Sequence, residues 1–186
     1  MRLRTLLPTL ALAAASLSAC AGGRADTRPG PMTEAEYLRG RDLMVPVQGV
    51  RRTQLRDTYN APRSGGRAHL ALDILAPRGT RVLSADDGVI LRITRNELGG
   101  KVIYIADPER RFVYYYAHLD EWKYGLAEGQ RVKRGQLIGS VGTTGNAPAD
   151  TPHLHFQLMR MGANGRWWDG APVNPLPYLR REGKER

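Results

Sequence analysis

Apolar and polar residues alternate with a period of two along most of this chain, and the helical period of 3.6 is rare. Segments such as Asp86-Asp87-Gly88 and Leu98-Gly99-Gly100 interrupt the alternation and predict tight turns. The pattern therefore predicts a mainly β fold, an antiparallel sheet that forms a sandwich or half-open barrel. The predicted strands are Arg81–Ala85, Gly88–Thr94, Lys101–Ala106, Arg111–His118, Gln136–Val141 and His153–Met159.

One short helix is expected before the first strand. Thr33 and Glu36 have the spacing of a capping box, and the helix is predicted to run to about Leu43. The main domain is expected over residues 45–179, a usual size for a single hydrophobic core. Residues 180–186 are expected to form a charged, frayed tail.

The N-terminus has the pattern of an export signal. A basic start is followed by an apolar stretch and then by Ser18 and Ala19. The apolar stretch is too short to cross a bilayer, which needs about 20 apolar residues. The only cysteine, Cys20, follows Leu17-Ser18-Ala19, which resembles a bacterial lipobox. We expect residues 1–19 to be a lipoprotein signal peptide and residues 20–44 to hold the lipidated Cys20, a tether and the short helix. An ordinary signal peptide or an uncleaved anchor is the alternative.

Composition narrows the class of protein. The chain of 186 residues is 41% hydrophobic and 25% charged, which is a globular balance. A single cysteine excludes an internal disulfide. The 28 Lys and Arg against 18 Asp and Glu give a net charge of +10. Basic proteins often bind nucleic acid, but no nucleic-acid recognition motif is present, so we expect no nucleic-acid partner. Attraction to an anionic cell envelope and to acidic peptides explains the charge better.

The four histidines lie in pairings that indicate a metal site. His153 and His155 are two residues apart on a predicted strand, so they share one face of the sheet with Gln157. His69 and Asp73 are four residues apart, about 13 Å on a straight strand. A bend before the strand or a helical turn would bring them together. Glycines upstream of His69 favour the bend.

Histidine nitrogens and a carboxylate oxygen are typical ligands of catalytic zinc, which has three protein ligands and one open position. The chain lacks a His-Glu-x-x-His helix, so the thermolysin arrangement is excluded. Two histidines and a carboxylate also bind non-haem iron. Iron would leave His118 and one of the strand histidines without a role.

Six motifs follow one another along residues 50–179. They are His69-x-x-x-Asp73, Ala76–Thr80, Ala85–Gly88, Tyr116-Ala117-His118-Leu119, Gly135–Gly139 and Pro152-His153-Leu154-His155-Phe156. In order and spacing they resemble the M23 peptidases, the lysostaphin-like zinc endopeptidases that cut peptidoglycan peptides. The resemblance extends over nearly the whole expected domain.

The resemblance implies a lysostaphin-like fold and one zinc ion with His69, Asp73 and His155 as its ligands. It implies that His118 and His153 are the catalytic histidines. The implied function is hydrolysis of peptide cross-links or stem peptides in peptidoglycan, for cell-wall remodelling. With the lipid anchor, the protein would face the periplasm from a membrane. Ala21, which follows Cys20 in place of an acidic residue, resembles outer-membrane sorting.

The sequence leaves alternatives for two features: the residues that line a substrate groove, and whether the protein is an enzyme or an activator. Tyr114 and Tyr116 alternate onto the face of His118, so either of them could line a substrate groove with Gln157, although packing within the sheet is the alternative role. Some proteins of this fold have lost their metal ligands and act as non-catalytic activators of cell-wall amidases. The motif residues are all intact here, which favours the enzyme.

Overall fold

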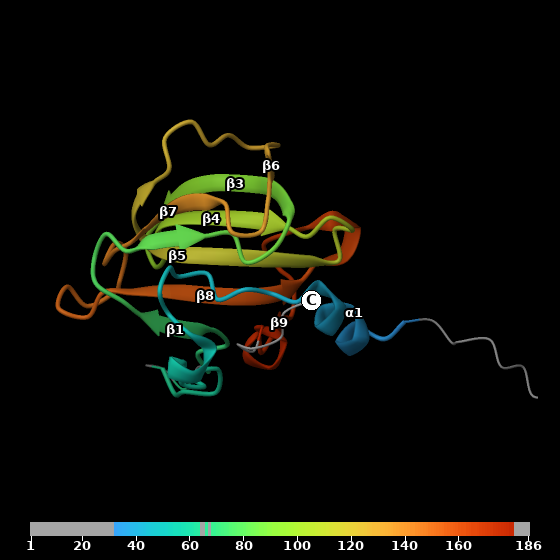
Figure 1. Cartoon of the computed structure of the whole chain (residues 1–186), viewed down its shortest axis with the longest axis horizontal. Helices are drawn as coiled ribbons and strands as arrows, with labels where there is room; N and C mark the ends of the chain where they lie inside the picture. Colours follow the sequence, from blue (N-terminus) through green and yellow to red (C-terminus); the bar gives the residue numbers. More distant parts are fainter. Residues whose placement is uncertain (1–31, 64–65, 67, 181–186) are drawn as a thin grey trace, which may run out of the picture. The chain divides into compact units, whose positions relative to one another are not determined.

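The computed structural model describes residues 32–63, 66 and 68–180 (Figure 1). The predicted signal peptide, Cys20, most of the tether and the tail from residue 181 lie outside the described residues. The described part contains one α-helix and an antiparallel sheet, so the mainly β prediction is confirmed. The elements are α1 (Glu34–Arg41), η1 (Arg52–Gln54), β1 (Leu72–Leu75), β2 (Arg81–Leu83), β3 (Gly88–Asn96), β4 (Gly100–Ala106), β5 (Phe112–Trp122), β6 (Arg131–Val132), β7 (Leu137–Val141), β8 (His153–Arg160), η3 (Ala163–Gly165), β9 (Pro172–Val173) and η4 (Leu176–Tyr178).

The sheet has the strand order β1-β8-β5-β4-β3-β6. Strand β7 pairs with β2 and β5, and β9 pairs with β8. Figure 1 shows β8 crossing the lower part of the molecule, with β5, β4 and β3 above it. Each of the six strands predicted from the period of two is present, with shifts of a few residues at the ends.

One face of the sheet forms the core. On β8, Leu154, Phe156 and Leu158 are fully buried, while the residues between them point to the other face. Ile103 and Ile105 of β4 are buried on the same side of the sheet. Each such side chain contributes about 1.5–3 kcal/mol of hydrophobic stabilisation. The core therefore holds the opposite face, which carries the histidines, in a fixed position.

Helix α1 begins with the predicted capping box, in which the Thr33 hydroxyl accepts a hydrogen bond from the Glu36 amide. It ends at Arg41 because Asp42 adopts a left-handed conformation with φ of 50°. Leu43, which was expected inside the helix, instead bridges to Leu179. We predicted that this helix belongs to the same segment as the tether, outside the main domain. Its side chains Tyr37 and Leu38 instead pack into the hydrophobic core.

Two buried carboxylates join the helix to the sheet, and we call them the core carboxylates. Asp86 accepts hydrogen bonds from the guanidinium of Arg41 at 2.7 and 2.9 Å and from the hydroxyl of Tyr114 at 2.8 Å. Asp107 accepts one from the hydroxyl of Tyr37 and three from backbone amides at 2.6, 2.7 and 3.4 Å. Every side-chain partner of these two acids is a donor, as buried carboxylates require.

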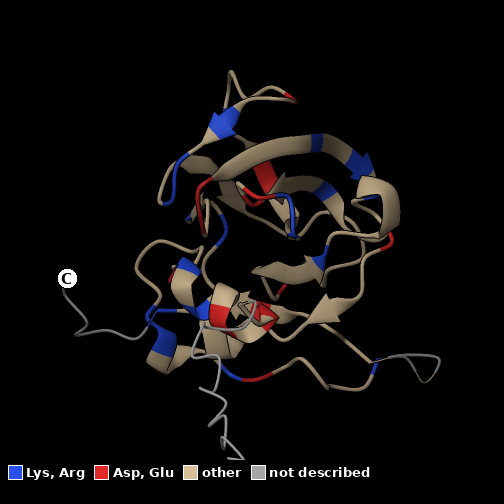
Figure 2. Ribbon diagram, turned by 90° about the vertical axis from the view of Figure 1, so that its right-hand side faces the viewer, with Lys and Arg blue, Asp and Glu red and all other residues tan. Residues whose placement is uncertain are grey.

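Charge is spread over the domain. Figure 2 shows Lys and Arg on several sides of the ribbon, with acidic residues between them. Many of the basic groups form ion pairs, such as Arg78 with Asp120 at 2.6 Å and Lys101 with Glu121 at 2.7 Å. Opposite charges therefore offset part of the positive charge locally.

Among the described residues, no helix has the length and apolar character needed to cross a bilayer.

Candidate active site

Three of the residues singled out in the sequence converge at the β1–β8 edge of the sheet. Asp73 on β1 pairs directly with His155 on β8, and His69 lies in the loop just before β1. Asp73 Oδ1 lies 2.9 Å from His69 Nε2 and 3.2 Å from His155 Nδ1, and the two ring nitrogens are 3.0 Å apart. Three potential metal-ligand atoms therefore form one compact cluster.

A bend before β1 brings His69 to Asp73. Leu70 has a φ of 59°, a left-handed conformation that turns the chain between the two residues. The Leu70 amide donates to the Tyr59 carbonyl at 2.7 Å, and the side-chain amide of Gln157 donates to the Leu70 carbonyl at 3.2 Å. The predicted bend is confirmed, and the helical-turn alternative is not observed. Gln157 stabilises this bend and is not among the residues that line the groove.

Backbone carbonyls fix the tautomer of three histidines. In each, ring nitrogen Nδ1 lies 2.8 Å from a backbone oxygen. A carbonyl only accepts hydrogen bonds, so Nδ1 carries a hydrogen, and Nε2 of the neutral ring presents its lone pair. The pairs are His69 with Thr58, His118 with Thr144 and His153 with Thr151. Sequence reasoning missed these threonines, because contacts through backbone oxygens leave no signal in residue type.

The cluster has more close contacts between polar atoms than it has hydrogens to place between those atoms. Asp73 forms an ion pair with the guanidinium of Arg63, which favours the charged form, so this carboxylate is an anion at pH 7. His69 Nε2 and Asp73 Oδ1 are both acceptors, which leaves their 2.9 Å contact without a hydrogen. Only the ring of His155 can supply one. An anionic oxygen and imidazole lone pairs that face one point fit a divalent cation of the zinc type.

Arg63 completes the surroundings of Asp73. Its guanidinium forms an ion pair with Oδ2, the carboxylate oxygen that faces away from His69 and His155. This contact leaves Oδ1 directed at the two histidines. Sequence reasoning missed Arg63, because it lies in an irregular loop where periodicity carries no information.

The two remaining histidines lie beside the cluster. The ring centroids of His118 and His153 are 4.9 Å apart, and His118 lies 5.6 Å from the ring of His155. His153 Nε2 is 3.7 Å from Asp73 Oδ1. Burial lowers the pKa of His118 to about 4, although its hydrogen bond to Thr144 opposes this shift. His118 is therefore a neutral imidazole at pH 7.

A bulge in β5 directs His118 toward the site. Strand β4 pairs Ile103 with Tyr116 and Lys101 with Leu119, so β5 has one residue more than β4 in this stretch. His118 itself has a φ of 60°. Such a bulge changes the face to which the following side chains point.

The bulge makes one prediction wrong. Tyr114 and Tyr116 were expected to share the face of His118, where either could line a groove, but both are fully buried in the core, with 0% exposure, so the alternative role of packing within the sheet is the one observed. The extra residue ends the strict alternation after Tyr116, so His118 no longer points the same way as these tyrosines. Tyr115 lies on the groove face in their place.

A groove of about 580 Å³ runs along the cluster. All four histidines line it, and Tyr115 and Ala117 of β5 form part of its wall. The other lining residues are Pro62, Arg63, Ala68, Leu98, Gly99, Asn146, Ala147 and Pro148. Loops far apart in the sequence therefore bound the groove, while the sheet supplies its chemically active wall.

Known proteins that are similar to this chain include peptidases. The family model described as "Peptidase family M23" matches residues 67–175. The chain is 36% identical over 132 residues to the L-Ala--D-Glu endopeptidase of Bacillus subtilis, covering 67% of this chain and 39% of the relative. It is 35% identical over 96 residues to the peptidoglycan DD-endopeptidase ShyC of Vibrio cholerae, covering 52% and 21%. The chain thus spans well under half the length of these curated relatives.

The fold has solved counterparts as well. The crystal structure of a zinc containing peptidase from Vibrio cholerae superposes with a TM-score of 0.58 at 28% identity, over 73% of this chain and 40% of that one. The stretch that the family model matches is more than half of the chain and includes the clustered histidines and Asp73. The sequence motifs, the fold and the match to the family model agree, and this chain belongs to peptidase family M23.

Proposed function

We propose that this protein is a zinc-dependent endopeptidase that hydrolyses peptide cross-links or stem peptides of peptidoglycan and so remodels the cell wall. The observation that carries the proposal is the cluster of His69, Asp73 and His155, whose two histidines line a groove together with His118 and His153. The names of the two relatives, a DD-endopeptidase of peptidoglycan and an L-Ala--D-Glu endopeptidase, support this substrate class.

In this proposal His69, Asp73 and His155 hold one zinc ion. The set of two imidazoles and a carboxylate matches the three-ligand pattern of catalytic zinc sites, and the similar peptidase from Vibrio cholerae is described as zinc containing. Bound zinc supplies Lewis-acid polarisation of the scissile carbonyl. The chain's own contribution is to hold the donors in place and to position the substrate peptide in the groove.

His153 and His118 handle protons in this proposal. Each presents the lone pair of Nε2 because Nδ1 is committed to a backbone carbonyl. Either can accept the proton of the attacking water as a general base. The imidazolium that forms then carries a hydrogen on Nε2, which it can donate to the developing oxyanion or to the leaving amine. The neutral state of His118 at pH 7 suits this role.

The test is digestion of purified, cross-linked muropeptides, with products identified by mass. We expect cleavage of a peptide bond, its loss with a zinc chelator, and its return when zinc is added. The masses also identify the bond that is cut. Intact substrate after incubation with the zinc-loaded protein would contradict the proposal.

The alternative is a non-catalytic activator of cell-wall amidases. That class is expected to have replaced metal ligands, whereas the motif residues are intact here. An activator would leave the muropeptides whole and would accelerate an added amidase. The digestion therefore separates the two functions when it is run with and without the amidase.

We further propose that the protein is exported and anchored by a lipid on Cys20, facing the periplasm from the outer membrane, with residues 1–19 removed. The support is the lipobox-like run before Cys20, and these residues lie outside the described part. More than one acyl chain makes such anchoring stable. Cys20→Ala should move the protein from the membrane to the soluble fraction or block its processing. Unchanged membrane association would remove the anchor from the proposal.

A further inference from the structure

Four aromatic residues form a continuous row that starts at the groove, and we call it the aromatic row. Tyr115 lines the groove, with its ring centroid 6.0 Å from that of His155. The ring of Tyr104 follows at 4.6 Å from Tyr115, and Trp167 follows at 4.5 Å from Tyr104. Trp168 ends the row, 5.2 Å beyond Trp167. Each ring is thus in contact range of the next.

The row lies on the same face of the sheet as the histidines. Tyr104 on β4 and Tyr115 on β5 are direct cross-strand partners. Ala117, two residues beyond Tyr115 and on its face, pairs with His155 of β8. The rings therefore extend the chemically active wall sideways across the sheet, from β8 and β5 toward β4.

The loop after β8 presents the two tryptophans in a fixed conformation. The Met161 amide donates to the Arg111 carbonyl at 2.7 Å, and the Gly162 amide donates to the Arg166 carbonyl at 2.8 Å. Arg166 and Asp169, which flank the tryptophans, form an ion pair at 2.6 Å. A Cβ atom on Gly162 would lie 2.0 Å from Asp169 Oδ1, so the loop closes on itself tightly. A surface that is ordered beforehand loses little entropy when it binds a ligand.

Packing explains Trp167 but not Trp168. Trp167 is partly buried and covers the ring of Tyr104. Trp168 is 59% exposed, one of only a few large apolar side chains at the surface of the described residues. Tyr and Trp are enriched at binding interfaces, and Trp168 adds an exposed indole to a row of rings that begins at the groove.

The chemistry of the substrate indicates what binds there, and this step rests on the proposed function. The peptides of peptidoglycan are bonded to a polymer of N-acetylated sugars, so a strand whose peptide lies in the groove must continue outside it. Sugar rings offer flat C–H faces to aromatic rings while their hydroxyl and acetamido groups stay hydrated. Tyr and Trp suit such a ligand, because each joins a large apolar ring to one polar group.

We propose that Tyr104, Trp167 and Trp168 form a binding site for the sugar rings of the glycan strand that carries the bound peptide. Trp168 provides the exposed stacking face, Trp167 and Tyr104 support it, and Tyr115 connects the site to the groove. The protein thereby recognises its polymer through the sugar chain as well as through the peptide.

The first test measures binding of a peptide-free sugar. The probe is the tetramer of N-acetylglucosamine, titrated into the full-length protein by calorimetry. We expect the wild type to bind it and Trp168→Ala to bind it about tenfold more weakly, because one stacked ring is lost. Trp168→Phe keeps a ring and should retain part of the affinity.

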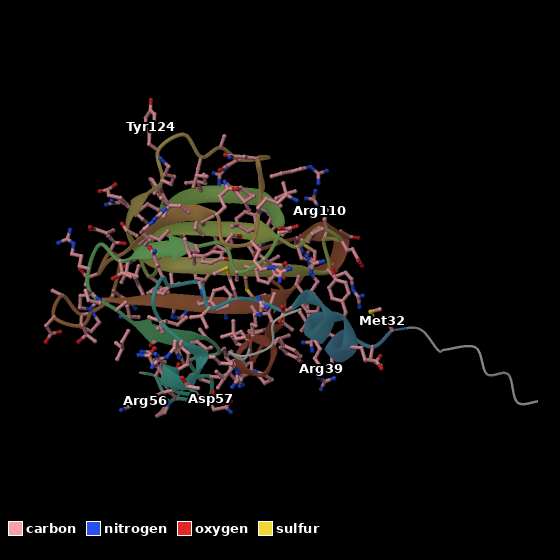
Figure 3. All side chains as sticks on the ribbon, viewed as in Figure 1. Met32, Arg39, Arg56, Asp57, Arg110 and Tyr124 are labelled. Atoms are coloured by element: carbon pink, nitrogen blue, oxygen red, sulfur yellow. The ribbon has the colours of Figure 1, made fainter. Side chains whose placement is uncertain are left out.

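Tyr124→Ala is the matched control. Tyr124 is 95% exposed and follows the Trp122 end of β5, whereas the tryptophan loop follows the Arg160 end of β8, which pairs with the opposite end of β5. Figure 3 shows Tyr124 at the top of the molecule, away from β8. Its removal should leave sugar binding unchanged. No tetramer binding by the wild type, or equal binding by Trp168→Ala, would overturn the proposal.

A second test compares two substrates. Trp168→Ala should lose more activity on intact sacculi than on cross-linked peptides from which the sugars have been removed. An equal loss on both would mean that the row binds peptide, and the proposal would fail. The sugar titration needs no hydrolysis, so it can succeed when the protein lacks peptidase activity and can fail when it is active. The outcomes for this site and for the proposed function are therefore distinguishable.

Discussion

Acids with little exposure to solvent occur in two regions of this molecule: Asp86 and Asp107 are fully buried and Asp73 is half-buried, and their surroundings are opposite in character. The core carboxylates, Asp86 and Asp107, receive hydrogen bonds from hydroxyl, guanidinium and backbone N–H groups. At the histidine cluster, Asp73 Oδ1 faces His155 Nδ1 and also His69 Nε2, whose hydrogen sits on the other ring nitrogen. In the core, each hydrogen-bond partner of the acids brings a hydrogen. In the histidine cluster, the contact between Asp73 and His69 has none.

The difference separates stabilising acids from functional ones. A buried carboxylate with enough donors strengthens the fold and has no free lone pair directed at a ligand. A carboxylate oxygen that faces ring nitrogens with too few hydrogens needs a cation to make that arrangement favourable. Burial and hydrogen counting thus indicate the proposed metal site more clearly than the number of acids does. The two regions should respond to mutation in different ways.

The largest expected effect concerns the groove histidines. His155→Ala removes one of the three proposed zinc ligands, so zinc content should fall sharply. His153→Ala should keep zinc while turnover falls about 10²–10⁴-fold, the usual contribution of a general acid–base group. His118→Ala should behave like His153→Ala. The measurements are metal content and muropeptide cleavage for each purified variant.

These variants also test the assignment of roles. If His153→Ala loses the metal while His155→Ala keeps it, the two roles are reversed. If both variants keep metal and activity, the groove is not the active site. The folded state should persist in all three variants, because the core lies on the other face of the sheet.

The next effect concerns the core. Asp86→Ala leaves the guanidinium of Arg41 and the hydroxyl of Tyr114 without their acceptor, and breaking a buried pair in this way costs about 3–5 kcal/mol. Because Arg41 is partly exposed, we expect the lower end of this range. Urea unfolding followed by circular dichroism measures the loss. Zinc content per folded molecule should be unchanged.

Glu97→Ala, which removes an exposed carboxylate in the β3–β4 turn, is the control and should change stability little. Equal stability of Asp86→Ala and the wild type would show that the core carboxylates do not hold the helix to the sheet. Loss of zinc from folded Asp86→Ala would show that the two regions are coupled.

A smaller effect is expected at Arg63, which contacts only the carboxylate oxygen that faces away from the histidines. Groups of this kind orient metal ligands, and their removal commonly weakens metal binding about 10–100-fold. Arg63→Ala should show such a loss in competition with a chromogenic zinc chelator, whereas Arg63→Lys should retain part of the affinity. Unchanged zinc affinity in Arg63→Ala would remove Arg63 from the proposed metal site.

The smallest effect concerns the helix that reaches the core carboxylates. Thr33→Ala removes the N-cap of α1 and should cost about 1 kcal/mol of stability. Thr33→Ser keeps the hydroxyl and is the control. Hydrogen bonds from Thr33 lower the pKa of Glu36, so the contribution of Glu36 is present above its unfolded pKa and is lost as the pH falls through its lower folded pKa. The difference between the two variants should therefore shrink in acid.

The sequence predicted much of the site because its signals there are local. Alternation along β8 placed His153 and His155 on one face, and their neighbours Leu154 and Phe156 are indeed in the core. The spacing of His69 and Asp73 required a bend, and the left-handed Leu70 provides it. The capping box at Thr33 and Glu36 predicted the start of α1. Each inference used residues within a few positions of one another.

By itself, then, the sequence determined which donor atoms are available, which residues alternate on each strand and where the chain turns. Only the tertiary structure decided how these parts face one another. Because of the bulge at His118, the groove is lined by Tyr115, while Tyr114 and Tyr116 are in the core. The bulge depends on the pairing of β5 with β4. The carbonyls that fix the histidine tautomers and the guanidinium of Arg63 come from irregular loops. Their positions follow from long-range packing, which local periodicity does not encode.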